Sequence, residues 1–159
     1  MAYKLIDSVT LGASAASVTF SSITQDYRDL VLVINATSSL AARRTMFARF
    51  NSDTGTNYKS VRMVGFGSLI ESATLNSSLF HIGVVGASAG NASSVTSIMD
   101  YSATDKHKTL LNRKGDITDT VTAQAMRWAN TSAINTILLW ASSGDIAAGS
   151  TFYLYGIEA

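Results

Sequence analysis

The last strand-like segment, Thr151 to Ile157, constrains the fold of this chain more than any other. Successive side chains of a strand point to opposite faces, so Phe152 and Leu154 share one face. Tyr153 and Tyr155 share the other face. Because neither face is polar, each must be covered by another part of the structure. We expect Phe152 and Leu154 to enter the core of the domain, and the two tyrosines to face another element or another subunit.

Short strand-like runs fill the rest of the chain, separated by turns of Gly, Asn, Asp and Ser. The segment Leu30 to Ala36 is almost continuously apolar, which is typical of a central strand buried on both faces. The segment Tyr58 to Val64 fits either a short helix or an irregular strand. The other expected strands are Tyr3 to Leu11, Val18 to Phe20, Thr45 to Phe50, Leu79 to Val85, Val95 to Tyr101, Lys108 to Arg113, Val121 to Trp128 and Ile134 to Trp140.

This pattern predicts a single domain over residues 1–159 with an all-β fold. About ten short strands at this spacing are typical of sandwiches and barrels. We expect a jelly-roll-like antiparallel β-sandwich. The chain is long enough to bury a core without disulfides, and it contains neither Cys nor Pro.

The composition predicts a neutral surface that is rich in hydroxyl groups. Ser and Thr together number 39, against 23 charged residues, and the formal net charge is +1. Nucleic acid and anionic membranes need a concentrated basic field, so we expect neither as a partner. The N-terminus shows no signal-peptide pattern, and no apolar run approaches the roughly 20 residues that span a bilayer. Low charge with 47% hydrophobic residues favours burial in an oligomer or a larger particle.

One loop places side-chain oxygens at alternate positions around Gly55, as calcium-binding loops do. Its candidate ligands are Asn51, Asp53 and Asn57. Only Asp53 is a carboxylate, and the seven residues after Asn57 contain no acidic side chain. Asn, Asp and Gly are also the ordinary residues of turns. We therefore predict a turn here and no metal site.

Catalytic chemistry finds little support in the sequence. His81 lies between Phe80 and Ile82 in an apolar strand, where a packed or interface histidine is expected. Cys is absent, so no thiol nucleophile is present. Asp105 and His107 crowd an expected turn, which explains them without a catalytic cleft. We expect no enzymatic activity and no cofactor.

Two groups of side chains are candidates for binding. Arg43, Arg44 and Arg49 form the one basic cluster, which fits either a solvated loop or a contact with an acidic patch on a partner. Arg43 and Arg44 therefore join Tyr153 and Tyr155 as predicted interface residues. The aromatic residues could stack on sugar rings, but most lie inside expected strands, where core packing explains them better.

The chain resembles small phage virion structural proteins that have a jelly-roll-like β-sandwich. The resemblance covers nearly the whole chain in order and contains no catalytic motif. The segments that carry it are Ser8 to Leu11 with Val18 to Phe20, Tyr27 to Ile34, Arg49 to Tyr58, Met99 to Tyr101 with Lys106 to Thr109, Trp128 to Ile134, and Ala148 to Ile157.

This resemblance implies a virion component that is made in the host cytoplasm. Such proteins occur as capsid decoration (cement) proteins and as parts of tail fibres and appendages. We expect a free-standing decoration protein that stabilises the shell through oligomeric packing. The expected partners are other copies of the chain, with a trimer slightly favoured, and virion proteins such as the major capsid protein. The alternative is a tail-fibre or appendage module that binds host surface glycans.

Overall fold

The computed structural model describes residues 2–87, 90–116 and 120–158 of the chain. These residues form twelve β-strands and no helix, and therefore no helix that could cross a membrane. In chain order the strands are β1 (Tyr3–Thr10), β2 (Ser17–Phe20), β3 (Asp29–Ala36), β4 (Arg44–Phe50), β5 (Tyr58–Phe66), β6 (Leu69–Ser77), β7 (Phe80–Val85), β8 (Ala92–Met99), β9 (Lys108–Gly115), β10 (Thr120–Trp128), β11 (Ile137–Ala141) and β12 (Thr151–Ile157).

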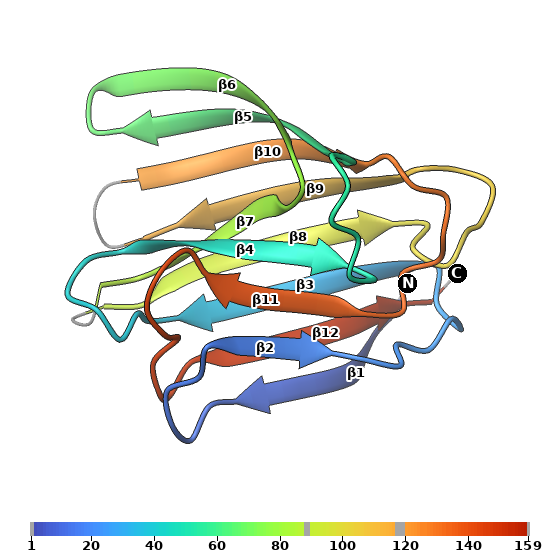
Figure 1. Ribbon diagram of the computed structural model, residues 1–159, viewed down its shortest axis with the longest axis horizontal. Coiled ribbons are helices and arrows are strands. Elements are labelled where there is room, and N and C mark those ends of the chain that lie inside the picture. Colours follow the sequence, from blue (N-terminus) through green and yellow to red (C-terminus); the bar gives the residue numbers. More distant parts are fainter. Residues whose placement is uncertain (1, 88–89, 117–119, 159) are drawn as a thin grey trace.

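The strands form two sheets of unequal width that pack face to face (Figure 1). The larger sheet has the order β1-β12-β3-β8-β9-β10-β5-β6, and the smaller sheet has the order β2-β11-β4-β7. All ladder pairs within the two sheets are antiparallel. The all-β antiparallel sandwich that the sequence predicts is therefore confirmed.

The hydrophobic core lies between the two sheets. One part of it is aromatic, where the ring centroids of Phe50 and Trp128 lie 5.6 Å apart at an interplanar angle of 82°. Tyr58 and Phe80 make a similar edge contact at 4.9 Å. Edge-to-face pairs add stability beyond the area that they bury. Trp128 and Tyr58 thus belong to the core, as predicted, and are not exposed for sugar binding.

The last strand has the two faces that the sequence predicts. Phe152 and Leu154 are completely buried in the core, which confirms their expected orientation. Tyr153 and Tyr155 are half-buried on the outer face of the larger sheet, with ring centroids 6.3 Å apart and nearly parallel planes. Although it ends the chain, β12 lies inside the sheet, between β1 and β3.

Two strands, β5 and β6, lie in segments for which no firm prediction was made. Residues Tyr58 to Phe66 form a regular strand, β5, in the segment that fitted either a helix or a strand. The next strand, β6, was not predicted, because its apolar and polar side chains do not alternate cleanly. A pattern of this kind is expected for an edge strand that is partly exposed on both faces.

The smaller sheet covers only part of the larger one. Its edge strand β7 packs against β8 and β9, whereas β10, β5 and β6 extend beyond it, toward the top of Figure 1. The inner face of these three strands therefore receives less cover than the rest of the sheet. This unequal width creates the cleft described next.

Candidate functional site

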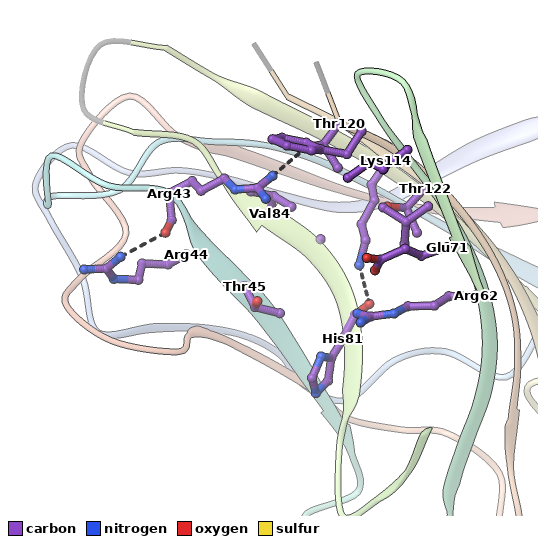
Figure 2. A pocket seen from close by; sticks show the side chains of 14 residues that line it. Arg43, Arg44, Thr45, Arg62, Glu71, His81, Val84, Lys114, Thr120 and Thr122 are labelled. Atoms are coloured by element: carbon purple, nitrogen blue, oxygen red, sulfur yellow. Dashed lines mark hydrogen bonds between the residues drawn. The ribbon is translucent and has the colours of Figure 1, made fainter. Parts of the chain in front are cut away.

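An open cleft lies between the overhanging strands β10, β5 and β6 and the edge of the smaller sheet (Figure 2). Its volume is about 350 Å³. Within the part of the chain that the structure describes, four cationic side chains and one carboxylate line it, together with threonine hydroxyls and a few apolar groups. Its lining includes Arg43, Arg44, Arg62, Phe66, Glu71, Lys114, Thr120 and Thr122.

Cross-strand pairing brings the polar side chains of the overhang together. Thr122 of β10 lies opposite Lys114 of β9. Two residues further along β10, Gln124 lies opposite Arg62 of β5. Directly opposed residues in antiparallel strands project from the same face of the sheet. The inner face of the larger sheet therefore carries polar and cationic side chains in this region, in place of the apolar side chains that form the core elsewhere in the sandwich.

Lys114 is the most deeply placed cation of the cleft. The residue is only 8% exposed, and its Nζ donates a hydrogen bond to the carbonyl oxygen of His81 at 2.7 Å. Burial, reinforced by the nearby charge of Arg62, lowers the pKa of Lys114 to about 8. Among the described residues Lys114 forms no ion pair. The folded chain therefore holds a desolvated cation next to open space.

Arg62 and Arg44 are also incompletely satisfied. The Nε atom of each guanidinium group is buried and has no hydrogen-bond partner among the described residues. In the same part of the chain neither side chain forms an ion pair. Both amide atoms of Gln124, beside Arg62, are buried without a partner as well. Buried polar groups without partners are uncommon and mark places where water or a ligand binds.

At the rim of the cleft the cation is paired with a carboxylate, unlike Lys114 on the floor. Arg43 Nη1 forms an ion pair with Asp116 at 2.7 Å and also donates to the Thr120 hydroxyl at 2.9 Å, so its charge is already compensated. Among the described residues, Glu71 on β6 supplies the one carboxylate that lines the cleft. Phe66, at the end of β5, is 49% exposed and gives the rim an aromatic surface.

His81 contributes its backbone to the cleft more than its ring. Its carbonyl oxygen accepts from Lys114, while its imidazole packs against Phe47 with ring centroids 5.0 Å apart. In Figure 2 the ring points away from the side chain of Lys114. Burial and the charges of Lys114 and Arg62 lower the pKa of His81. The predicted role of His81 as a packed histidine therefore agrees with its surroundings.

The basic cluster seen in the sequence is divided by the fold. Arg43 and Arg44 line the cleft, whereas the Arg49 guanidinium lies 5.1 Å from the ring centroid of Trp140. Tyr153 and Tyr155 lie on the outer face of the larger sheet, a different surface from the cleft. The four predicted interface residues therefore belong to two separate sites, and their interface role stays a prediction.

The loop with the candidate calcium ligands is tied together by hydrogen bonds. The Asp53 carboxylate accepts from Gly55 N at 2.8 Å, from Asn57 Nδ2 at 2.9 Å and from Trp128 Nε1 at 2.7 Å. The Asn51 amide instead bonds to the backbone of residues 133–136. Because Asn57 turns its NH₂ group toward Asp53, its oxygen and the Asp53 carboxylate do not converge on one point. The geometry fits the predicted turn.

The outer face of the larger sheet is strongly apolar where β9, β10 and β5 run side by side. Met63, Leu111 and Val121 are 62%, 58% and 67% exposed. A hollow of about 520 Å³ lies among Val61, Met63 and Leu111. Exposed apolar surface of this extent is typical of contact regions. The sequence reasoning did not locate this face, because it depends on which strands become neighbours.

Sequence reasoning also missed the floor of the cleft, although one signal was present. The inward-facing positions of β10 change along the strand from Trp128 and Met126 to Gln124, Thr122 and Thr120. A strand that covers a core along its whole length would stay apolar on that face. This change in polarity shows where the core ends and the cleft begins.

A short segment bounded by two glycines lies between β7 and β8. Gly86 to Gly90 reads Gly-Ala-Ser-Ala-Gly, which has the form of a hydrolase nucleophile elbow. That motif requires a strand followed by a helix, whereas this segment lies between β7 of the smaller sheet and β8 of the larger sheet. Ser88 itself lies outside the described residues. The flanking structure therefore does not match the context of the motif.

No protein-family model matches the chain, and a search of curated proteins found no match. Solved structures with a similar architecture include the CBM40 domain of the Ruminococcus gnavus IT-sialidase bound to α2,3-sialyllactose, with a TM-score of 0.41 and 9% identity. That match covers 96% of this chain and 92% of the other.

Two further structures have comparable scores. The alginate lyase Aly36B in complex with alginate tetrasaccharide matches with a TM-score of 0.38 and 11% identity over 96% of this chain and 79% of that one. An exo-inulinase from Aspergillus awamori matches with a TM-score of 0.43 and 14% identity over 100% of this chain and 29% of that one. All three TM-scores lie below 0.5, so these likenesses carry no argument about function.

Proposed function

We propose that this chain is a virion surface module that binds host-surface carbohydrate in the cleft and does not catalyse a reaction on it. The observation that carries the proposal is the combination of groups in one open cleft of about 350 Å³. An exposed aromatic ring, Phe66, lies beside the hydrogen-bonding side chains of Arg62, Glu71 and Thr122. The virion setting rests on the resemblance in sequence to phage virion proteins.

The proposed mode of binding follows from the chemistry of sugars. A pyranose ring has an apolar face that can stack on an aromatic ring and a rim of hydroxyls that need hydrogen-bond partners. Phe66 supplies the stacking surface at the mouth of the cleft. The guanidinium of Arg62 donates to hydroxyls, and the carboxylate of Glu71 accepts from them. Both groups are planar and can contact two neighbouring hydroxyls at once.

Replacing Phe66 with Ala is expected to weaken carbohydrate binding about tenfold, which corresponds to roughly 1.4 kcal/mol. The loss comes from the stacking surface, because Phe66 is half exposed and contributes little to the core. Isothermal titration calorimetry with oligosaccharides of several compositions, free in solution, measures the affinity of both proteins. Val121→Ala, on the outer face of the adjacent strand, serves as the matched control and should leave binding unchanged. Equal affinities of the Phe66→Ala protein and the parent would contradict this mode of binding.

A second function, shell decoration, is favoured by the outer face of the larger sheet. On β12 and β1 this face presents Tyr153, Tyr155, Tyr3 and Leu5, of which Tyr3 and Leu5 are largely exposed. Aromatic side chains are enriched at protein interfaces, and these four carry no charge. A second copy of the chain fits such a surface, as the sequence analysis expects for a decoration protein.

Under this second function Tyr155→Ala is expected to shift the protein from oligomer to monomer while its thermal midpoint changes by only a few degrees. Tyr155 is half-buried on the outer face, so its removal deletes contact area without opening the core. Light scattering across a dilution series, combined with thermal unfolding, separates the two effects. A stable monomer of the unaltered chain at high concentration would exclude decoration through self-association.

A further inference from the structure

We propose that the carbohydrate bound in the cleft is acidic, and that its singly charged carboxylate or sulfate group binds between Lys114 and Arg62. This inference rests on the proposed carbohydrate-binding function and names the class of ligand. It is carried by the buried, uncompensated charges on the cleft floor, whereas the carbohydrate proposal is carried by Phe66 and the open shape of the cleft.

The first step concerns Lys114. A buried ammonium group without a counter-ion is unfavourable, and folded proteins normally pair such a charge. One of its three N–H bonds is directed at the His81 carbonyl oxygen. The ammonium group of Lys114 makes no other hydrogen bond within the described residues, and the side chain lines the cleft. An anionic group of a ligand would supply the missing partner for the remaining donors.

The second step concerns Arg62, whose guanidinium shares the cleft with Lys114 (Figure 2). Its buried Nε has no partner among the described residues. Guanidinium groups bind planar anions through two parallel hydrogen bonds, which a carboxylate matches closely. The charge of Arg62 also contributes to lowering the pKa of Lys114, so the two cations repel each other. A single anion between them would relieve that repulsion.

The third step limits the ligand to one negative charge near the floor. Arg43 is already paired with Asp116, and the Arg44 side chain extends away from Lys114 and Arg62 in Figure 2, so neither adds to the attraction for an anion between these two cations. Glu71 lines the same cleft and would repel a second ligand charge. A carboxylate or a sulfate ester carries one charge, whereas a phosphate monoester carries nearly two at neutral pH. An acidic sugar therefore fits better than a phosphorylated one.

The alternative for Lys114 is a purely structural role. The edge strand β7 turns two carbonyl oxygens toward the larger sheet, and side chains of that sheet bond to both. Ser94 Oγ and Asn112 Nδ2 each donate to Ile82 O at 2.8 Å, and Lys114 donates to His81 O. Lys114 could then serve only to hold β7 in place. In that case its removal would change stability and leave ligand selectivity unaltered.

The decisive experiment compares three oligosaccharides of equal length, one carrying uronic acids, one carrying sulfate esters and one neutral. Calorimetry on the full chain should give at least tenfold tighter binding for an acidic oligosaccharide than for the neutral one. Lys114→Met and Arg62→Gln should each remove most of this preference. The matched control is Arg113→Gln, because Arg113 neighbours Lys114 in β9 but projects from the opposite face. It should leave the preference intact.

The outcomes separate the two proposals. Equal affinity for acidic and neutral oligosaccharides would overturn the inference and leave carbohydrate binding standing. Binding of none of the three would overturn the proposed function itself. If inorganic sulfate bound as tightly as the sulfated oligosaccharide, the cleft would be an anion site and both proposals would fail. The comparison of the uronate with the sulfate ester then identifies the charged group.

Folding of the variants is checked by circular dichroism. If Lys114→Met did not fold, the unaltered chain would still provide the test through its amide resonances. Addition of the acidic oligosaccharide should shift the amide signals of Lys114 and Thr122, which lie opposite each other on the cleft wall. Shifts confined to the outer-face residues would contradict the assignment.

The pH dependence offers an independent readout. Affinity for the acidic oligosaccharide should fall between about pH 7 and pH 9, because Lys114, with a pKa of about 8, loses its charge in this range. The other charged or titratable side chains facing the cleft, among the described residues, are Arg44, Arg62, Glu71, His81 and the paired Arg43 and Asp116. Burial and the charges of Lys114 and Arg62 lower the pKa of His81, which favours its neutral form in this range. Lys114→Met should abolish the decrease. A decrease that persisted in that variant would contradict the role of Lys114.

Discussion

Deleting residues 151–159 is expected to abolish folding. The deletion removes β12, which pairs with β1 on one side and with β3 on the other. Without it β1 has no partner in the sheet, and β3 becomes an exposed apolar edge that is prone to aggregation. The core also loses Phe152 and Leu154, both completely buried. Circular dichroism and size-exclusion chromatography should show an unfolded or aggregated chain.

A point substitution tests the same strand without removing its backbone. Leu154→Ala should lower the free energy of unfolding by roughly 2–5 kcal/mol, because it leaves a cavity in a fully packed core. Thr151→Ala, at the less buried start of the strand, is the matched control and should cost far less. Denaturant titration measures both. A truncated chain that folded, or a Leu154→Ala protein as stable as the parent, would contradict the central place of β12.

Replacing Asp53 with Ala is expected to lower the free energy of unfolding by about 2–4 kcal/mol. Its carboxylate accepts hydrogen bonds from Gly55, Asn57 and Trp128, and the Trp128 side chain is completely buried. Removal of the carboxylate leaves the indole N–H without a partner inside the protein. Asn130→Ala is a suitable control, since its contact with Asp53 is long, at 3.5 Å.

The same network makes stability depend on pH. Burial of the Asp53 carboxylate raises its pKa, but the hydrogen bonds from Asn57, Gly55 and Trp128 outweigh burial, and the net pKa is lowered. The network therefore stabilises the fold fully above the unfolded pKa of about 4. Its contribution is lost as the pH falls through the lower folded value. In the Asp53→Ala protein the free energy of unfolding, measured by denaturant titration at a series of pH values, should decrease less in the acid range than in the parent.

Addition of a chelator tests whether the loop around Asp53 is held by hydrogen bonds alone or also by a bound calcium ion. We expect the thermal midpoint of the parent protein to stay unchanged when a chelator is added. A decrease of more than about 4 °C, on the order of 1 kcal/mol, would instead support metal ligation by Asn51, Asp53 and Asn57. Because the acid sensitivity of Asp53 exists in either case, the chelator result and the pH result are independent.

The sequence alone determined the fold class and the orientation of the last strand. Alternation in Thr151–Ile157 placed Phe152 and Leu154 inside, and the structure confirms both. Period-two patterns are local, so they can be recognised without knowing the neighbours of a strand. The same reasoning failed at β6, where an edge strand with partly exposed faces shows no clean alternation.

Only the tertiary structure decided where the cleft lies. Arg43 and Arg44 were visible as a basic pair, but Lys114 and Arg62 lie in other strand segments, and the sequence analysis did not single them out. They meet because β10 pairs with both β9 and β5, and because the smaller sheet stops at β7. Strand order and sheet width depend on long-range pairing, which local patterns do not encode. For that reason the charge of the cleft emerges from the fold and not from any single segment.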